Sequence, residues 1–533
     1  MQLSPSAHAD TFCRDNLPAP GLWPDLDLSM PGLDYPEQLN AADELLEATI
    51  ASRGPDRRCL LSPEETWSYG DLSARASQIA RVLTEDLGLV PGNRVLLRGP
   101  NNPWLVACWF AVLKAGGVAV ATMPMLRTAE LTTICDIAQV SLALCDHRFT
   151  EELTAVPGVR VITYGGSGSG DLIALAGAKR PEFTSIRTSG DDVAMIAFTS
   201  GTTGRPKATM HFHRDLLAVA DTFSALVLKP EPDDLFTGTP PLAFTFGLGA
   251  LVLFPFRVGA ATLLLEKATP AELADQIAAH GVTVVSTAPT AYRAMLAASK
   301  ADQLRGLRRP VSAGEHLPAS TWRAFYDATG VQIIDGIGST EMLHIFIAAA
   351  DDDIRPGSTG LPVPGYRAVI LDAEGKQVPD GEPGKLAVKG PTGCRYLSDP
   401  RQETYVQDGW NITGDTYTRD ADGYFWYQAR SDDMIISGGY NIAGPEIEEV
   451  LLAHPDVAEC GVVGIPDEAR GQIVKAFVVL RDGSAADDAK ARELQDLVKD
   501  RIAPYKYPRS IEFVQALPRT NTGKLQRFRL REE

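Results

Sequence analysis

The chain has 533 residues and a formal net charge of −18 at pH 7. This length is two or three times that of an ordinary domain, so we expect a large body with one or more appended units. Phosphate backbones are held by clustered lysine and arginine, so the acidic balance argues against a general nucleic-acid binder. Hydrophobic residues make up 44% of the chain and charged residues 22%, a balance that excludes a disordered protein.

Cysteine usage and the N-terminus indicate the compartment. The seven cysteines are scattered and lack C-x-x-C spacing, which argues against a disulfide framework or a structural zinc site and fits a reduced cytosol. The N-terminus lacks a basic start followed by an apolar stretch, so no signal peptide is predicted. Residues 248–265 are the most apolar stretch, but Pro255 and Arg257 interrupt it, whereas a membrane-spanning helix needs roughly 20 predominantly apolar residues. We interpret this stretch as buried core and predict a cytoplasmic protein without membrane association, either a monomer or a homodimer.

The first half of the chain alternates between strand and helix patterns. A short β-branched run at 94–97, an apolar helical pattern at 103–115 and a second run at 118–121 predict a β-α-β unit. Gly116 and Gly117 follow the helical pattern, where a helix end favours left-handed backbone. The same alternation returns at 282–287 and 289–298. These patterns predict an α/β protein with parallel sheets covered by helices.

After Gly357 the pattern changes to short strands separated by turn sequences at 372–375, 380–381 and 422–423, which predict a small β-rich subdomain. The polar and glycine-containing stretch around 431–439 then indicates a boundary. Beyond it, a helix is expected at 446–453, strands at 457–463 and 473–480, and a helix at 489–500. We therefore predict a large N-terminal domain, residues 1–431, and a small α+β C-terminal domain, residues 432–533.

One polar loop follows directly on the apolar run 193–198. Its glycines allow backbone N–H groups to curl around an anion, while its hydroxyls and Lys207 add donors and positive charge, a combination that suits a polyphosphate. It is not a Walker motif, because the G-x-x-x-x-G-K-[ST] spacing fails. The alternative is an ordinary surface loop. The candidate phosphate-binding residues are Thr199, Ser200, Gly201, Thr202, Thr203, Gly204 and Lys207.

Four further motifs follow in order: Gly338-Ser339-Thr340-Glu341, Thr413-Gly414-Asp415, Arg430-Ser431-Asp432 and the loop 518–524 that ends in Lys524. With the polar loop, they make the chain resemble the adenylate-forming superfamily of acyl-CoA synthetases, adenylation domains and luciferases. The resemblance implies a large N-terminal AMP-binding domain, built from two α/β subdomains and a small β-rich subdomain, and a mobile C-terminal domain. It also implies ATP and Mg2+ as cofactors.

The resemblance assigns a role to each motif. Glu341 is expected to hold Mg2+, which prefers hard oxygen ligands, and Thr340 to reach the α-phosphate. Asp415 is expected to accept hydrogen bonds from the ribose hydroxyls, with Arg430 as a second sugar contact. Two segments are expected to enclose the adenine, although Gly314 could serve only a tight turn. The further nucleotide-binding candidates are Ser339, Gly314, Glu315, His316, Asp335, Gly336 and Ile337.

The resemblance implies two half-reactions, adenylation of the acid and transfer of the acyl group to a thiol, and a different arrangement of the C-terminal domain for each. The resemblance makes Lys524 the lysine that stabilises negative charge on the phosphoryl oxygens during adenylation. It also makes Asp432 the hinge about which the domain swings to present Gly438 and Gly439 for transfer of the acyl group to coenzyme A.

Within the superfamily the chain is most similar to benzoate and 2-aminobenzoate CoA ligases, through residues 335–346 and 244–249, and residues 386–397 favour the 2-aminobenzoate branch. The hydroxyl of Thr245 could accept a hydrogen bond from an ortho-amine, and His344 could bind the carboxylate or the ring substituent; either side chain could equally be core. The predicted substrate-binding residues are Phe244, Thr245, Phe246, Gly247, Gly338, Leu343 and His344.

The predicted function is thus an AMP-forming aryl-CoA ligase that acts on 2-aminobenzoate. Benzoate is the alternative acid. A carrier protein is the alternative acceptor, since the sequence places neither a phosphate-binding surface for coenzyme A nor a protein-docking surface. A nucleotide-binding protein without turnover is the third possibility, but it would not need Lys207, Glu341, Asp415, Arg430 and Lys524 together.

Overall fold

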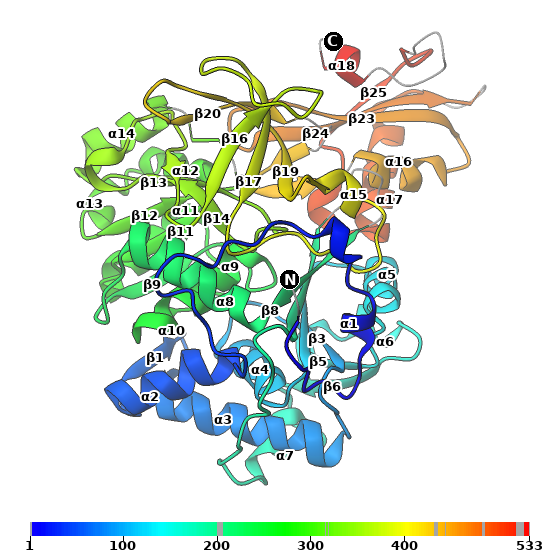
Figure 1. Cartoon of the computed structure of the whole chain (residues 1–533). Coiled ribbons are helices and arrows are strands. Elements are labelled where there is room, and N and C mark those ends of the chain that lie inside the picture. Colours follow the sequence, from blue (N-terminus) through cyan, green and yellow to red (C-terminus); the bar gives the residue numbers. More distant parts are fainter. Residues whose placement is uncertain are drawn as a thin grey trace.

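The computed structural model describes residues 3–199, 206–314, 316–317, 319–430, 435–442, 444–481, 485–518 and 527–531. Figure 1 shows two large sheets with their helices in the N-terminal part, a smaller sheet beside them, and the C-terminal strands gathered at one end of the molecule. The mixed α/β architecture, with a large N-terminal and a smaller C-terminal part, confirms the predicted fold class.

The first large sheet has six strands in the order β6-β5-β3-β4-β7-β8. Strands β3 to β7 pair in parallel, and β8 returns antiparallel to β7. The predicted β-α-β unit is present, because Asn102 caps the helix that joins β3 to β4 and Gly116 follows it at φ +71°. The elements are β3 Arg94–Arg98, α4 Pro103–Lys114, β4 Val118–Thr122, α5 Thr128–Ala138, β5 Leu142–Asp146, α6 Glu151–Thr154, β6 Arg160–Tyr164, α7 Leu172–Gly177, β7 Val193–Thr199, β8 Lys207–Phe212 and α8 His213–Val219.

The second large sheet has nine strands in the order β15-β14-β13-β12-β11-β9-β10-β1-β2. Its central strands from β10 to β13 are parallel, so their carboxyl ends lie at one edge, where ligands of α/β sheets bind. The elements are β1 Arg58–Leu61, β2 Thr66–Ser68, α3 Tyr69–Arg81, β9 Leu235–Gly238, α9 Thr245–Leu248, α10 Phe254–Val258, β10 Ala261–Leu263, α11 Pro270–His280, β11 Val284–Thr287, α12 Pro289–Ala297, α13 Ala301–Leu304, β12 Arg309–Ser312, α14 Ala319–Thr329, β13 Ile334–Gly338, β14 Ile345–Ala348 and β15 Leu361–Pro362.

One hydrophobic core joins the two large sheets. It includes Val95 and Leu97 of β3, Phe236 of β9 and Ile345 of β14. The apolar stretch 248–265 lies almost wholly inside the protein, as predicted. No helix in the described part of the chain combines the length and apolarity needed to span a bilayer.

The third sheet is antiparallel and lies against the first two (Figure 1). Its strands are joined by turns in which Gly375, Gly381 and Gly423 adopt positive φ, which confirms the predicted β-rich subdomain. The elements are β16 Arg367–Leu371, β17 Gly384–Lys389, α15 Gln402–Tyr405, β18 Val406–Gln407, β19 Trp410–Arg419 and β20 Phe425–Arg430.

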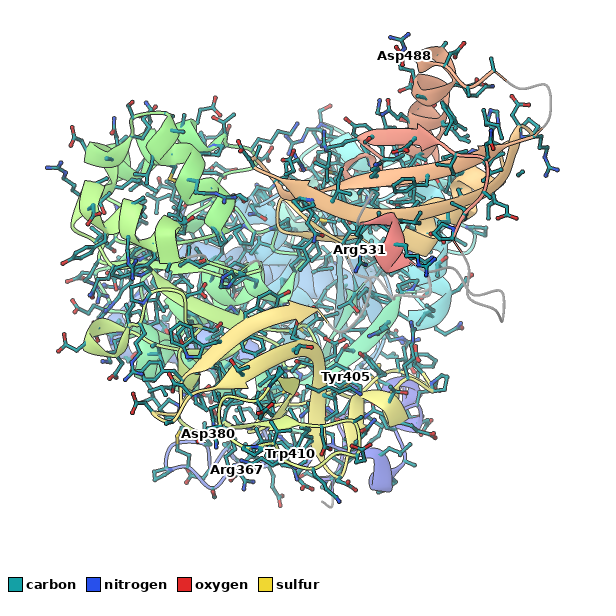
Figure 2. The ribbon with its side chains drawn as sticks, turned by 90° about the horizontal axis from the view of Figure 1, so that it is seen from above. Arg367, Asp380, Tyr405, Trp410, Asp488 and Arg531 are labelled. Carbon is teal, nitrogen blue, oxygen red and sulfur yellow. The ribbon has the colours of Figure 1, made fainter. Side chains whose placement is uncertain are left out.

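The described residues from 435 to 531 form a unit with its own sheet and core, called here the C-terminal unit. Its core contains Ile447 and Leu451 of α16, Val462 of β23, Val478 of β24 and Leu494 of α17. Figure 2 shows this unit over one side of the N-terminal body, with Asp488 at its far end. The elements are β21 Ile435–Ser437, β22 Tyr440–Ile442, α16 Gly444–Leu452, β23 Val457–Asp467, β24 Gly471–Leu480, α17 Asp488–Arg501, the short helix η8 Pro504–Lys506, β25 Ser510–Phe513 and α18 Arg527–Leu530.

Candidate active site

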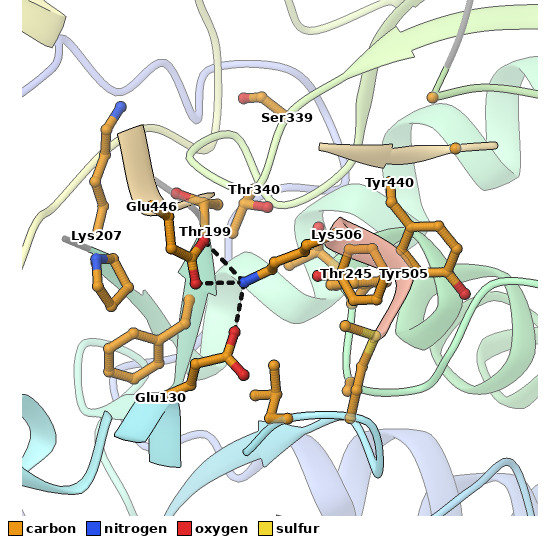
Figure 3. Close-up of a pocket in the computed structure, with 18 of the residues that line it drawn as sticks. Glu130, Thr199, Lys207, Thr245, Ser339, Thr340, Tyr440, Glu446, Tyr505 and Lys506 are labelled. Atoms are coloured by element: carbon orange, nitrogen blue, oxygen red, sulfur yellow. Dashed lines mark hydrogen bonds and ion pairs between the residues drawn. The ribbon is translucent and has the colours of Figure 1, made fainter. Parts of the chain in front are cut away.

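A cavity of ≈ 1240 Å³ lies between the N-terminal body and the C-terminal unit. Residues from both large sheets, the β-rich subdomain and the C-terminal unit line it (Figure 3). Fourteen of the sequence-predicted site residues are among them. They are Thr199, Lys207, Phe244, Thr245, Phe246, Gly314, Gly338, Ser339, Thr340, Glu341, His344, Asp415, Gly438 and Gly439.

The two described ends of the predicted phosphate loop lie side by side in the cavity wall. Thr199 ends β7 and Lys207 begins β8, and the two residues are direct partners in the antiparallel pair. The Lys207 ammonium lies 3.8 Å from Glu341 Oε1 and within 6 Å of two tyrosine rings, at 5.4 Å from Tyr396 and 5.9 Å from Tyr405. Residues 200–205 lie outside the described part of the chain, so the predictions for Ser200, Gly201, Thr202, Thr203 and Gly204 stay untested.

Glu341 sits on the loop that follows β13 and is 7% exposed. The Tyr396 hydroxyl donates a hydrogen bond to Glu341 Oε1 at 2.5 Å. His211 Nε2 donates to the carbonyl oxygen of Thr340 at 2.8 Å, and burial lowers the pKa of His211 to about 4, so this imidazole is neutral. His211 of β8 and Tyr396, from the segment between β17 and α15, therefore fix the loop that carries Thr340 and Glu341.

Ser339 is held on the same loop. Its hydroxyl lies 3.3 Å from the Tyr405 hydroxyl and accepts a hydrogen bond from the Met342 backbone N–H at 3.2 Å. Tyr396, Tyr405 and His211 are not among the residues predicted from the sequence. Tyr396 does fall within the run 386–397 that carries the family resemblance, and this position is the signal that could have drawn attention to it.

The segments expected to enclose the adenine reach the cavity only in part. Gly314 lines it at φ +87°, a backbone conformation that favours glycine, so the tight-turn alternative also accounts for this residue. His316 stacks instead on Tyr427, with ring centroids 5.4 Å apart. Asp335, Gly336 and Ile337 lie within β13 and do not line the cavity. Glu315 lies outside the described residues.

Asp335 is nevertheless unusual. Its Oδ1 atom is buried and has no hydrogen-bond partner within the described residues, and burial raises the pKa of this carboxyl to about 8.

Asp415 lies in β19 directly after Gly414, whose φ is +81°, and it is 8% exposed. Thr413, Gly414 and Asp415 line the cavity together. Asp415 is the strand partner of Arg430 in β20, so the two predicted ribose contacts belong to adjacent backbone positions.

Two aromatic side chains and His344 form the predicted acid-binding part of the cavity. Phe244, Thr245 and Phe246 come from the start of α9, and all three line the cavity. His344 packs among aromatic rings at centroid distances of 5.6 Å from Phe223, 5.6 Å from Phe246 and 4.5 Å from Phe254. Burial lowers the pKa of His344 to about 3, so its ring is uncharged at neutral pH.

Three residues of this region, Gly247, Gly249 and Leu343, contribute to packing around the cavity. A Cβ on Gly247 would lie 2.1 Å from the Pro241 carbonyl oxygen, and a Cβ on Gly249 would lie 2.2 Å from His344 Cδ2. Leu343 adopts φ +70° and is buried in the core. Neither Gly247 nor Leu343 lines the cavity. Gly249, at the end of the run 244–249, is the residue that leaves room for His344.

The C-terminal unit closes the cavity with the loop between β21 and β22. Gly438 and Gly439 adopt φ +55° and +78°, and Tyr440 follows with its ring 6.4 Å from that of Phe244. The orientation of the unit therefore brings the Gly438-Gly439 loop to the same space as Thr245 and Asp415. Lys524 and Asp432 lie outside the described residues.

Comparisons with known proteins match almost the whole chain. The family model described as AMP-binding enzyme matches residues 47–396, and the model described as AMP-binding enzyme C-terminal domain matches residues 446–524. The predicted boundary between residues 431 and 432 falls in the unmatched segment and remains a proposal. A benzoate–CoA ligase of Thauera aromatica is 35% identical over 513 residues, which are 94% of this chain and 97% of that protein.

Solved structures agree with this match. The anthranilate CoA ligase AuaEII, solved in complex with anthranoyl-AMP, is 35% identical with a TM-score of 0.73 and covers 94% of this chain and 98% of its own. A benzoate CoA ligase from Burkholderia xenovorans is 32% identical with a TM-score of 0.70, covering 92% and 100%. The amide bond synthetase McbA from Marinactinospora thermotolerans is 28% identical with a TM-score of 0.82, covering 93% and 99%.

Proposed function

We propose, from the premise that the chain belongs to the AMP-binding enzyme family and is an acid–thiol ligase, that it converts 2-aminobenzoate to its CoA thioester through an acyl-adenylate. One observation carries this proposal: Lys207, Glu341 and Asp415, far apart in sequence, line one cavity together with aromatic side chains and the Gly438-Gly439 loop.

The chemistry requires two displacements. A carboxylate oxygen of the acid attacks the α-phosphorus of ATP and pyrophosphate leaves; the sulfur of CoA, having lost its proton, then attacks the acyl carbonyl and AMP leaves. Lys207, largely buried in the cavity wall, is suited to neutralise phosphate charge there, because charge interactions are stronger away from bulk water. Asp415, as a buried carboxylate, is suited to accept hydrogen bonds from the ribose hydroxyls.

Magnesium fits the residues that are present. The described residues contain no group of three or more His, Cys, Asp or Glu side chains arranged to hold a metal, and Mg2+ commonly needs only one or two protein carboxylates when phosphates supply further ligands. Glu341 would be the protein ligand, and the ion would neutralise the phosphates when bound.

The tautomer of His344 favours an amino-substituted acid. Its Nε2 lies 3.4 Å from the Phe246 carbonyl oxygen, which only accepts, so we assign the proton to Nε2. Nδ1 is then a lone-pair acceptor, and it is buried with no partner among the described residues. An ortho-amine can donate to such an acceptor, whereas a carboxylate cannot. The relation to AuaEII points in the same direction, and the benzoate–CoA ligases keep benzoate as the alternative acid.

The decisive assay incubates the protein with ATP, Mg2+, CoA and a panel of benzoates and follows AMP and acyl-CoA by mass spectrometry. We expect AMP and 2-aminobenzoyl-CoA in equal amounts. Acyl-AMP without thioester would favour loading of a carrier protein, and no turnover of any aryl acid would refute the proposal.

The acid preference is tested in the pocket itself. Replacing Thr245 by Ala removes a hydroxyl while leaving the aromatic walls, so kcat/KM for 2-aminobenzoate should fall about 10-fold relative to benzoate, as for one lost hydrogen bond. The readout is the ratio of the two kcat/KM values in the native protein and the variant. An unchanged ratio would remove Thr245 from the recognition of the amine. The cytoplasmic location and the oligomeric state remain predictions.

A further inference from the structure

A buried cluster of three charged side chains joins the C-terminal unit to the N-terminal body. The Lys506 ammonium, at the end of η8, lies 2.5 Å from Glu130 Oε1 and 2.7 and 2.9 Å from the two carboxylate oxygens of Glu446 (Figure 3). Glu446 lies in the first turn of α16 and so belongs to the same unit as Lys506, whereas Glu130 lies in the first turn of α5. Glu130 is the member of this cluster that belongs to the N-terminal body, so its contact with Lys506 crosses between the two parts.

Glu130 is held rigidly. Its second oxygen, Oε2, accepts hydrogen bonds from the Arg127 backbone N–H at 2.9 Å and from the Ala503 backbone N–H at 3.1 Å. The first of these bonds fixes the carboxylate at the N-terminus of α5, and the second adds another link to the C-terminal unit. Nearby, Arg127 Nη2 donates to the Lys499 carbonyl oxygen at 3.2 Å.

The cluster is buried and carries an excess of negative charge. The side chains of Lys506, Glu130 and Glu446 are 6%, 11% and 14% exposed. Burial and the nearby Glu130 carboxylate raise the pKa of Glu446 above its usual range, although Lys506 opposes them. Without the ammonium, two carboxylates would share a nearly dry site, which is a strongly unfavourable arrangement. We therefore expect the observed orientation of the C-terminal unit on the N-terminal body to depend on Lys506.

The cluster is coupled to the glycine loop through two stacked rings. Tyr505 directly precedes Lys506, and its ring stacks on Tyr440 with centroids 4.3 Å apart. Tyr440 directly follows Gly439, at the mouth of the cavity. A contact that fixes Lys506 therefore also fixes the Gly438-Gly439 loop.

We propose that Glu130 is a positioning residue that, through Lys506, holds the C-terminal unit with the Gly438-Gly439 loop over the cavity, and thereby supports transfer of the acyl group to the thiol without contributing to formation of the adenylate. This proposal rests on the proposed function. When the unit turns, Glu446 leaves together with Lys506 as a neutral pair and Glu130 becomes exposed to water. Both orientations thus avoid an unpaired buried ammonium, so the contact can form and break within the catalytic cycle.

The test separates the two half-reactions in Glu130→Ala and Lys506→Met. Formation of acyl-AMP, measured by pyrophosphate release without CoA, should stay within about 2-fold of the native rate. Thioester formation from supplied acyl-AMP and CoA should fall about 10-fold or more, equivalent to about 1.4 kcal/mol. The double variant should be no slower than the slower single variant, because both changes remove one contact. Lys475→Met is the matched control, since Lys475 pairs with Glu512 at 2.7 Å wholly inside the C-terminal unit.

A second measurement needs no activity. All seven native cysteines are buried, so cysteines introduced at Glu374 and Asp488, one in each part, can be spin-labelled selectively. Pulsed EPR should give one main distance in the native background and a broader or shifted distribution in Glu130→Ala. Equal losses in both half-reactions, or an unchanged thioester rate with unchanged distances, would overturn the proposal. Failure to form any acyl-AMP with altered distances would instead refute the proposed function while supporting the contact.

Discussion

The most informative single contact is the hydrogen bond from Tyr396 to Glu341. Tyr396 lies 55 residues after Glu341, and its ring also faces the Lys207 ammonium at 5.4 Å. One side chain thus orients both the proposed metal ligand and the proposed phosphate-binding lysine. Sequence motifs identified Lys207 and Glu341. The run 386–397 includes Tyr396, but nothing local in the sequence shows that this tyrosine folds back onto the Glu341 carboxylate.

Removing the Tyr396 hydroxyl should impair adenylation selectively. In Tyr396→Phe the Glu341 carboxylate stays buried but loses its donor, so its orientation is no longer fixed. We expect the adenylation rate to fall about 10-fold and half-maximal activity to require more Mg2+, with thermodynamic stability reduced by about 1–3 kcal/mol. The measurement is pyrophosphate release as a function of Mg2+ concentration.

Tyr366→Phe is the control for this change. Tyr366 is also buried and also hydrogen-bonded, to Thr392 at 2.9 Å, but it does not line the cavity. It should lose stability without a change in the Mg2+ dependence. The same Mg2+ dependence in both variants would mean that Tyr396 acts only through folding.

At the scale of elements, the junction of β8 and α8 buries two histidines. His211 Nε2 donates a hydrogen bond to the Thr340 carbonyl oxygen, and His213 Nδ1 accepts a hydrogen bond from the Ala41 backbone N–H at 3.1 Å. Burial lowers the pKa of His211 to about 4 and that of His213 to about 3, from an ordinary value of 6.5. Below pH 6.5 the unfolded chain therefore binds more protons than the folded protein.

Acid should therefore destabilise the folded protein. Stability at neutral pH should be lost progressively as the pH falls from about 6.5 towards 3, and each buried histidine should account for about 2 kcal/mol of that loss at pH 5. In His213→Gln the difference in unfolding free energy between pH 7 and pH 5 should shrink by about that amount, as measured by urea denaturation. His280→Gln, at an exposed position of α11, should leave the difference unchanged. An identical shrinkage in both variants would contradict this account.

Local sequence predicted individual elements well where their ends carry strong signals. The helix expected at 103–115 is α4 Pro103–Lys114, because Asn102, Pro103 and Gly116 mark its ends. The helix expected at 489–500 is α17 Asp488–Arg501. The pairing of strands was not predictable in the same way: β1 lies beside β10, about 200 residues later, and only the packed core brings them together.

At the scale of the whole molecule, the motifs predicted which segments meet but not how the two parts are oriented. The structure places the Gly438-Gly439 loop at the cavity. The contact between Lys506 and Glu130 accompanies this orientation, and neither residue belongs to a motif recognised in the sequence. Glu130 and Lys506 are 376 residues apart, and each resembles an ordinary surface charge in the sequence.

The proposed hinge gives a prediction at this scale. Asp432→Pro should restrict backbone rotation between the two parts, because proline fixes φ near −65°. Adenylation should be preserved and thioester synthesis impaired about 10-fold or more, measured as separate half-reactions. Equal loss of both rates would count against a hinge at this position.

The division of the hydrophobic cores has a consequence for heating. The two large sheets share one core, whereas the C-terminal unit has a core of its own. Scanning calorimetry should therefore resolve a small endotherm for the C-terminal unit beside a large one for the N-terminal body, and saturation with an adenylate analogue, which touches both, should draw the two peaks together.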